Sequence, residues 1–241
     1  MPPRPAALKN KEFPPEFQAI MAAIADNLQA IRKRLGGATL LAVSKGQGAE
    51  RVREAFAAGQ RAFGENYVQE ALEKMAALQG DDDAADIEWH LIGPLQSNKT
   101  RDAAGHFAWV HTVASEKIAR RLSEQRPSDR PPLNVLIQVN ASGEATKSGV
   151  PPSNVLPLCE AVAALKNLRL RGLMAIPEPG APRERYREMK TLFDAIRERF
   201  GMDTLSMGMS DDMELALQEG STMVRIGTAI FGPRQKIRSA A

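Results

Sequence analysis

Short apolar runs rich in β-branched residues alternate along the chain with longer segments whose apolar residues recur at helical spacing. This alternation is typical of β-strand and α-helix units whose strands pair in parallel. Eight strands are predicted, at residues 39–44, 61–64, 88–93, 109–113, 134–140, 169–176, 204–209 and 223–230. Helices are predicted near residues 15–35, 49–58, 67–78, 97–104, 115–125, 152–166, 182–200 and 211–219.

Eight strands with helices between them match the (β/α)8 TIM barrel, and 241 residues is close to the roughly 250 that are typical of this fold. The helix near 15–35 is additional and is expected to cover the lower end or the side of the barrel. Periodicity alone also allows an open, doubly wound sheet. We predict an α/β protein in which residues 1–241 form a single domain, with 1–14 as a flexible N-terminus and 233–241 as a tail.

Composition narrows the class of protein. Hydrophobic residues make up 43% and charged residues 25% of the chain, as in ordinary globular proteins. The net charge is only +3, and few aromatic residues accompany the basic clusters at 31–34 and 234–238, so we expect no nucleic-acid partner. The N-terminus lacks the apolar core of a secretory signal, and no run of about 18 apolar residues exists, which predicts a cytoplasmic protein without membrane contact.

Few residues are suited to thiol or metal chemistry. Cys159 is the only cysteine, and its helical context predicts a small buried hydrophobic side chain. The three histidines do not have the spacing of a metal motif, so no metal site is predicted. The acidic run at 81–83 is interpreted as an exposed turn between a helix and a strand, with a cation site as the alternative.

The carboxyl ends of barrel strands carry the chemistry of such folds, and here the first strand ends at Lys45. An unpaired ammonium is costly to bury, so Lys45 needs a partner or a reaction. The last two strands end in Met209-Ser210 and Gly227-Thr228. Hydroxyl groups and exposed backbone N–H groups at such turns suit a phosphate dianion. Ser210 is further predicted to be the N-cap of a helix, with residues 211–212 in its first turn and Gly220 just past its end.

A lysine amine facing a phosphate site points to pyridoxal 5′-phosphate, whose aldehyde condenses with lysine and whose phosphate anchors the far end. Lys45 is then predicted to form a Schiff base. Strand alternation puts Arg225 on the inner face with Met223 and Gly227, where its guanidinium needs an acceptor. The pyridine nitrogen of the cofactor would serve, and an arginine there disfavours protonation of the ring, which weakens it as an electron sink.

Six stretches carry a resemblance to a known family: LLAVSK, FGENYVQE, WHLIGPLQSNK, VNASGEATKSG, LRGLMAIP and LSMGMSDDMELALQEGSTMVRIGTAIFG. In this order they resemble the pyridoxal-phosphate homeostasis proteins of the alanine racemase N-terminal-domain superfamily. The resemblance implies the alanine racemase type of barrel and a cofactor site made of Lys45 (Schiff base), Asn66, His90, Met209, Ser210, Arg225, Gly227 and Thr228. Where relatives often have a Thr-Lys-Pro-like stretch after the lysine, this chain has Gly46-Gln47-Gly48, which changes the local loop.

The resemblance also implies a protein that holds pyridoxal phosphate for intracellular vitamin B6 and amino-acid homeostasis, with little or no turnover and no established catalytic residue. Pyridoxal-phosphate-dependent apoenzymes are the implied partners, and a monomer is expected. The alternative is a weak amino-acid racemase, which needs a second acid/base opposite the lysine. Only Tyr67 and Tyr186 exist, and Tyr186 is expected on an outer helix.

The histidines and two further lysines can each be interpreted as structural or surface residues or as part of a binding site. His90 is either a ring-lining residue or a core histidine with satisfied hydrogen bonds, and His106 and His111 are interpreted as structural. Lys99 and Lys147 lie in predicted loops near the same rim. They are interpreted as solvated surface lysines, with a secondary anion or cofactor site as the alternative.

Overall fold

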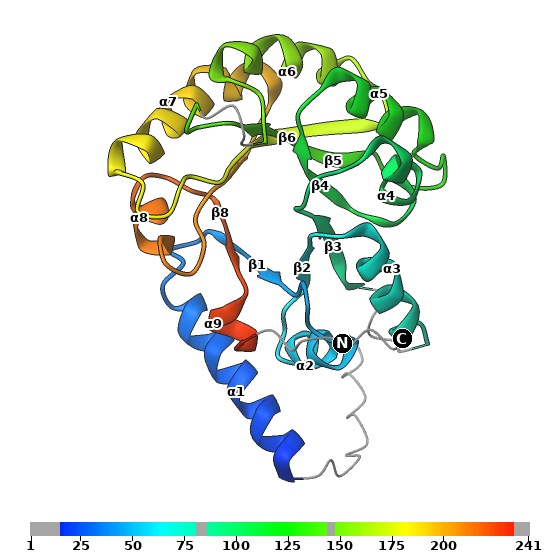
Figure 1. Cartoon of the computed structure of the whole chain (residues 1–241), viewed down its shortest axis with the longest axis vertical. Helices are drawn as coiled ribbons and strands as arrows, with labels where there is room; N and C mark the ends of the chain where they lie inside the picture. The colour runs from blue at the N-terminus through cyan, green and yellow to red at the C-terminus, as the bar shows by residue number, and fades with distance from the viewer. Residues whose placement is uncertain (1–14, 81–85, 144–147, 234–241) are drawn as a thin grey trace, which may run out of the picture.

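The protein is described by a computed structural model that covers residues 15–80, 86–143 and 148–233. In these residues eight parallel strands form a closed barrel in chain order, and the last strand pairs with the first (Figure 1). The strands are β1 (Thr39–Val43), β2 (Ala62–Glu65), β3 (Glu88–Leu91), β4 (Trp109–Val113), β5 (Leu133–Val139), β6 (Leu168–Ala175), β7 (Thr204–Ser206) and β8 (Met223–Ile226). The TIM barrel is confirmed, and the open sheet was the wrong alternative.

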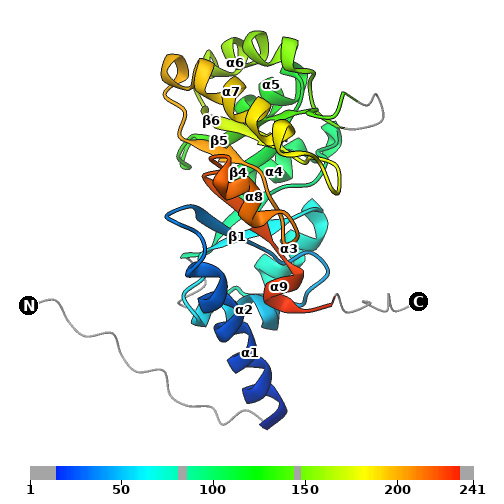
Figure 2. The same cartoon turned by 90° about the vertical axis from the view of Figure 1, so that its left-hand side faces the viewer.

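Helices surround the barrel (Figure 2). They are α1 (Pro15–Arg32), α2 (Ala49–Ala57), α3 (Val68–Ala77), α4 (Thr100–His106), α5 (Glu116–Gln125), α6 (Val155–Ala163), α7 (Arg183–Phe200), α8 (Met213–Gln218) and α9 (Thr228–Phe231), with short 3-10 turns η2 (Ser97–Lys99) and η3 (Pro152–Asn154). The additional helix α1 packs on the outside, where Asn27 donates a hydrogen bond to the Ile230 carbonyl at 3.1 Å and Arg32 donates to the Ala58 carbonyl at 2.9 Å.

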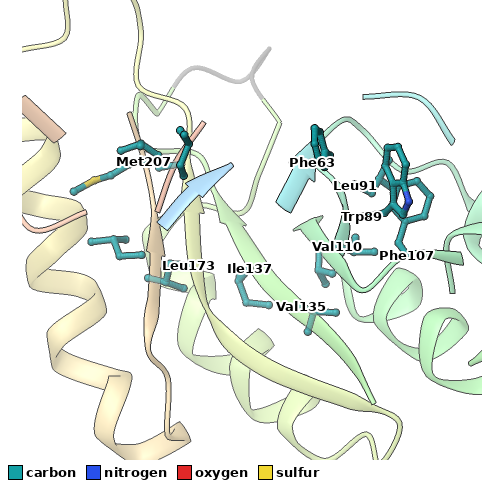
Figure 3. Close-up of a cluster of buried hydrophobic side chains, with 14 of the residues drawn as sticks. Phe63, Trp89, Leu91, Phe107, Val110, Val135, Ile137, Leu173 and Met207 are labelled. Carbon is teal, nitrogen blue, oxygen red and sulfur yellow. The ribbon is translucent and has the colours of Figure 1, made fainter. Parts of the chain in front are cut away.

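Alternation along the strands divides the core into two layers. Outward-facing side chains pack against the helices in one large apolar cluster, part of which is drawn in Figure 3, including Phe63, Trp89, Leu91, Val135, Ile137 and Leu173. Two small clusters face inward instead: Leu41, Ala62 and Met223, and Trp109, Leu136 and Met174. The rest of the barrel interior is therefore available to polar side chains.

The last two strands are shorter than predicted. β7 ends at Ser206, and Gly208 then turns the chain at a φ of 94°, where a Cβ would lie 2.5 Å from the Ala216 Cβ. β8 ends at Ile226, because the predicted continuation forms the short helix α9. Both strands thus end before the hydroxyl residues that follow them, which places these residues in loops.

The predicted cap at Ser210 is wrong. Helix α8 begins at Met213 and its N-cap is Asp212. The Asp212 carboxylate accepts a hydrogen bond from the Met209 backbone N–H at 2.6 Å, so the chain forms a turn before the helix starts. Gly220 follows the end of the helix at a φ of 88°, as predicted.

Several smaller predictions can be placed. Cys159 is fully buried on α6, and burial raises the pKa of its thiol to about 12, which confirms a packing role. No helix among the described residues is both long and apolar enough to span a bilayer. The acidic run at 81–83, Lys147, the N-terminal residues 1–14 and the tail after residue 233 lie outside the described residues.

Candidate functional site

A pocket of about 320 Å³ opens at the carboxyl ends of the strands. It is lined by residues that end or follow β2 to β6, namely Asn66, Ile92, Gly93, Pro94, Thr112, Gln138, Val139, Asn140, Ala141, Ser148, Ile176, Pro177, Glu178 and Pro179. The backbone is closely packed here, since a Cβ on Gly93 would lie 2.1 Å from the Asn66 carbonyl oxygen. The pocket occupies the face on which barrel folds carry their chemistry.

Lys45 is half-buried and lies two residues past the end of β1, at this face. The side chain of Ser44 points outward, because its hydroxyl donates to Glu65 at 2.6 Å on the helix side of the barrel wall. If the alternation of β1 continued one residue past Ser44, the Lys45 side chain would face the inner side, and this orientation stays a prediction. The end of β8 is adjacent, since a Cβ on Gly227 would lie 3.1 Å from the Val43 carbonyl oxygen. Lys45 and Thr228 therefore follow neighbouring strand ends.

The loops after β7 and β8 carry two hydroxyl groups. Ser210 is half-buried and Thr228 is exposed. Within the described parts of the chain, neither hydroxyl takes part in an intramolecular hydrogen bond, so both are available to a ligand. Met209 lies beside them at the rim and is 39% exposed. These residues provide the polar contacts that a phosphate group requires.

A link to an outer helix fixes the loop after β7. The hydroxyl of Tyr186, on α7, donates to one carboxylate oxygen of Asp212 at 2.6 Å, while the other oxygen accepts from the Met209 N–H. Burial and the neighbouring Asp212 carboxylate raise the pKa of Tyr186. The sequence placed Tyr186 on an outer helix correctly, but it gave no signal for this contact across 26 residues.

Arg225 faces the barrel interior, as predicted, and is only 4% exposed. Its Nη1 donates to the Ser206 carbonyl at 2.9 Å and to the Ser206 hydroxyl at 2.7 Å, and its Nη2 donates to the Ala175 carbonyl at 2.9 Å. Desolvation lowers the pKa of this guanidinium to about 10. A guanidinium has five N–H donors, so these three bonds leave two donors without an acceptor in the described residues. The side chain is held in place and can still bind a ligand acceptor.

His90 lies deep in the barrel and is fully buried. Its Nε2 is 2.8 Å from the Glu88 carboxylate and its Nδ1 is 2.9 Å from His111 Nε2, while its ring stacks on Trp109. Because Glu88 can only accept, His90 Nε2 carries the proton and His90 Nδ1 accepts from His111. Both ring nitrogens thus have protein partners, which matches the core-histidine interpretation; a contact of His90 with a cofactor ring stays a prediction.

The same order of donors makes His111 Nδ1 an acceptor, and this buried atom has no partner in the described residues. Burial lowers the pKa of both histidines, His111 more strongly, and the charges of His90 and Arg225 add to the effect on His111. The hydrogen bond with His90 lowers the pKa of Glu88. The pair is therefore neutral in the folded protein at neutral pH.

This neutrality predicts acid sensitivity. An unfolded histidine binds a proton near pH 6.5, whereas the folded pKa of His111 lies well below that value. Between the folded and the unfolded pKa, the unfolded state binds more protons than the folded state. The free energy of unfolding therefore falls as the pH drops below 6.5, by about 1.4 kcal/mol for each pH unit and for each such histidine. Denaturant unfolding of the wild type and of His111→Gln between pH 7 and 5 measures the difference. The variant should give a flatter profile, and two parallel profiles would contradict the prediction.

A buried charged cluster lies behind Lys45, on the helix side of the barrel wall. It consists of Ser44, Glu65, Glu70 and Lys74, and we call it the Lys74 cluster. Lys74 Nζ donates to the carboxylates of Glu65 at 2.7 Å and Glu70 at 2.8 Å, and to the Ser44 carbonyl at 2.7 Å. Desolvation raises the pKa of Glu65, against the opposing effect of the Lys74 ammonium. Sequence reasoning missed this cluster, although the spacing of Glu70 and Lys74 on one predicted helix face was a signal for the pair.

The predicted site residues thus fall into two groups. Lys45, Asn66, Met209, Ser210, Gly227 and Thr228 follow strand ends at the pocket face, and Arg225 lies below them in the interior. His90 is buried in the histidine pair instead. Of all these residues only Asn66 lines the pocket itself; Lys99, which ends the turn η2, does not line it either.

Comparisons with known proteins agree with this architecture. Residues 21–235 match the family described as alanine racemase, N-terminal domain. A pyridoxal phosphate homeostasis protein of Pseudomonas aeruginosa is 54% identical over 230 residues, which cover 89% of this chain and 97% of that protein.

Solved structures of similar proteins point to the same family. PipY of Synechococcus elongatus has been solved without and with bound PLP; the two structures have TM-scores of 0.81 and 0.78 and identities of 38% and 37%, and each match covers 87% of this chain and 100% of that chain. An alanine racemase of Corynebacterium glutamicum, at 20% identity and a TM-score of 0.67 over 92% of this chain and 63% of that one, shares the fold. The chain therefore belongs to the alanine racemase N-terminal-domain family and, within it, to the pyridoxal phosphate homeostasis proteins.

Proposed function

We propose that this protein binds pyridoxal 5′-phosphate at the carboxyl end of the barrel, with Lys45 as the residue that forms a Schiff base with it. The observation that carries the proposal is the juxtaposition of a half-buried lysine after β1 with two available hydroxyl groups after β7 and β8. A relative at 37% identity was solved with PLP bound, which supports the choice of ligand.

The residues at the face fit the groups of this cofactor. Ser210 and Thr228, with the backbone at Gly227 and the adjacent Met209, would hold the phosphate. One of the two remaining donors of Arg225 would reach the pyridine nitrogen, and Asn66 would line the ring from the pocket side. A guanidinium that is charged at neutral pH and lies at a pyridine nitrogen keeps this nitrogen as an acceptor.

When bound, the cofactor would supply an aldehyde, and the Lys45 amine would form the C=N bond with its carbon while the carbonyl oxygen would leave as water. The Lys45 amine must lose its proton before it attacks. The chain thus supplies a positioned amine, a phosphate cradle and a donor for the ring.

We propose that the protein holds pyridoxal phosphate with little or no turnover, and that it acts in intracellular vitamin B6 and amino-acid homeostasis. Pyridoxal-phosphate-dependent apoenzymes would be the recipients, and a monomer would be the working form.

The alternative function, racemisation, needs an acid/base on the face of the cofactor opposite the lysine. The hydroxyl of Tyr186 is bonded to Asp212, and Tyr67 is 64% exposed. Neither observation favours a racemase. An amino-acid racemisation rate far above that of free cofactor would overturn the holding role.

The binding proposal is tested by the visible absorbance of the purified protein loaded with pyridoxal phosphate, before and after borohydride, followed by mass mapping of the modified lysine. A stable pyridoxyl group on Lys45 is expected. A protein that stays colourless with added cofactor would refute the proposal.

The phosphate cradle gives a separate prediction. The double variant Ser210→Ala with Thr228→Val removes two hydroxyl donors, each worth about 0.5–1.5 kcal/mol and more against a charged group. We expect retention of the cofactor on dialysis to fall about tenfold or more, while Ser128→Ala, in an exposed loop, leaves it unchanged. Equal retention by all three proteins would place the phosphate elsewhere.

A further inference from the structure

We propose that Glu70 and Lys74 are positioning residues for Lys45, because together they hold the backbone on both sides of it. This inference rests on the proposed function of Lys45. It assigns a role to the Lys74 cluster, whose four members lie on the helix side of the barrel wall and are not among the residues that line the pocket.

Lys45 lies within a tight turn. The Gln47 backbone N–H donates to the Ser44 carbonyl at 3.0 Å, which closes a four-residue turn with Lys45 in second place. Gly46 takes the third place at a φ of 69°, a conformation that glycine adopts without strain. The Gly46-Gln47-Gly48 stretch therefore shapes the turn, but the two glycines add freedom next to the reactive residue.

Two contacts from α3 remove this freedom. Lys74 Nζ donates to the Ser44 carbonyl at 2.7 Å, on the peptide before Lys45. The Glu70 carboxylate accepts from the Gly46 N–H at 2.5 Å, on the peptide after it. Glu70 and Lys74 are four residues apart on one helix face and are themselves paired at 2.8 Å. Both peptides that flank Lys45 are thus bonded to one rigid helix.

The remaining members anchor this helix face to the barrel wall. Glu65, at the end of β2, is fully buried and accepts from both Lys74 and the Ser44 hydroxyl through the same oxygen. Burying charged groups costs free energy that their pairing only partly offsets, so a contribution to stability does not by itself explain the cluster. A requirement for an accurately placed lysine explains it, because displacement of a reacting group by about 1 Å can slow a reaction by about two orders of magnitude.

The test measures how fast Lys45 reacts. Wild type, Glu70→Ala, Glu70→Gln and Lys74→Met are mixed with pyridoxal phosphate, trapped with borohydride at timed intervals and mapped by mass spectrometry. We expect Glu70→Ala to slow modification of Lys45 about tenfold and to raise the share of label on other lysines. Glu70→Gln keeps an amide oxygen for the Gly46 N–H and should stay within about twofold of the wild-type rate. Lys74→Met, which loses the donor to Ser44, should be slowed several-fold.

The matched control is Glu116→Ala, which removes another carboxylate from a helical i,i+4 ion pair, with Arg120 on α5. All rates are measured at a temperature below the thermal unfolding midpoint of each protein, and Lys74→Gln replaces Lys74→Met if that variant does not fold. Equal rates for wild type, Glu70→Ala and Lys74→Met would overturn the positioning role. Absence of label from the wild type would instead refute the proposed function, so the two failures are distinguishable.

Discussion

Replacing Lys45 with alanine is expected to abolish the borohydride-stable label and to weaken retention of pyridoxal phosphate by about 100-fold, equivalent to about 3 kcal/mol. The reason is that Lys45 is the lysine that follows β1 at the pocket face, next to the end of β8. The contacts of Ser210, Thr228 and Arg225 would remain, so binding should be weakened and not eliminated. Equilibrium dialysis and mass mapping measure the two effects.

The control for this variant is Lys99→Ala. Lys99 ends the turn η2, which follows β3, and β1 and β2 separate β3 from β8 in the closed barrel. It should keep wild-type labelling and retention. If Lys45→Ala kept the label at wild-type level, another lysine would be the reactive one, and the assignment of the turn after β1 would be wrong.

Replacing Gly172 with alanine is expected to have the largest effect on stability, about 3 kcal/mol or more. Gly172 adopts a φ of 154°, which side chains rarely tolerate, and its Cβ would lie 1.7 Å from the Thr204 carbonyl oxygen of β7. That oxygen belongs to backbone in the neighbouring strand and cannot move aside cheaply. In a protein of this size the change corresponds to a fall in Tm of about 6–12 °C.

Gly105→Ala is the matched control for Gly172→Ala. Gly105 lies inside α4, and a Cβ there would meet nothing within 4 Å. Alanine is the better helix former, so this variant should gain about 0.5–1 kcal/mol. Thermal unfolding of both variants measures the contrast. A Gly172→Ala protein as stable as wild type would mean that β6 and β7 can separate at this point without cost.

The barrel could be predicted from the sequence because its evidence is local and repeated. Eight apolar runs between helical segments specify the element order, and each strand end was found within a few residues. The position of Lys45 just after the first strand and of Arg225 within the last could be predicted as well, since each depends only on locating one strand. The errors arose in short segments whose residues are compatible with more than one local structure. Residues 228–231 are apolar enough for a strand but form a helix turn, and Asp212 rather than Ser210 caps α8.

Contacts between elements far apart in the chain could not be predicted. The register between β5 and β6 shifts after Val135, so that Leu170 and Leu173 both pack outward and strict alternation fails. The bonds from Tyr186 to Asp212 and from Lys74 to Ser44 join residues 26 and 30 positions apart. A single sequence contains the polar residues but not the distances between them.

The buried Cys159 makes the protein convenient for site-specific reporters. It is the only thiol in the chain, and its raised pKa keeps it in the poorly nucleophilic protonated form. A cysteine introduced at an exposed position, such as Ser128 at a distance from the pocket, would react with a maleimide dye while Cys159 stays unmodified. Fluorescence from one defined position could then follow transfer of a bound molecule from this protein to an acceptor in real time, without the background that a second thiol would add.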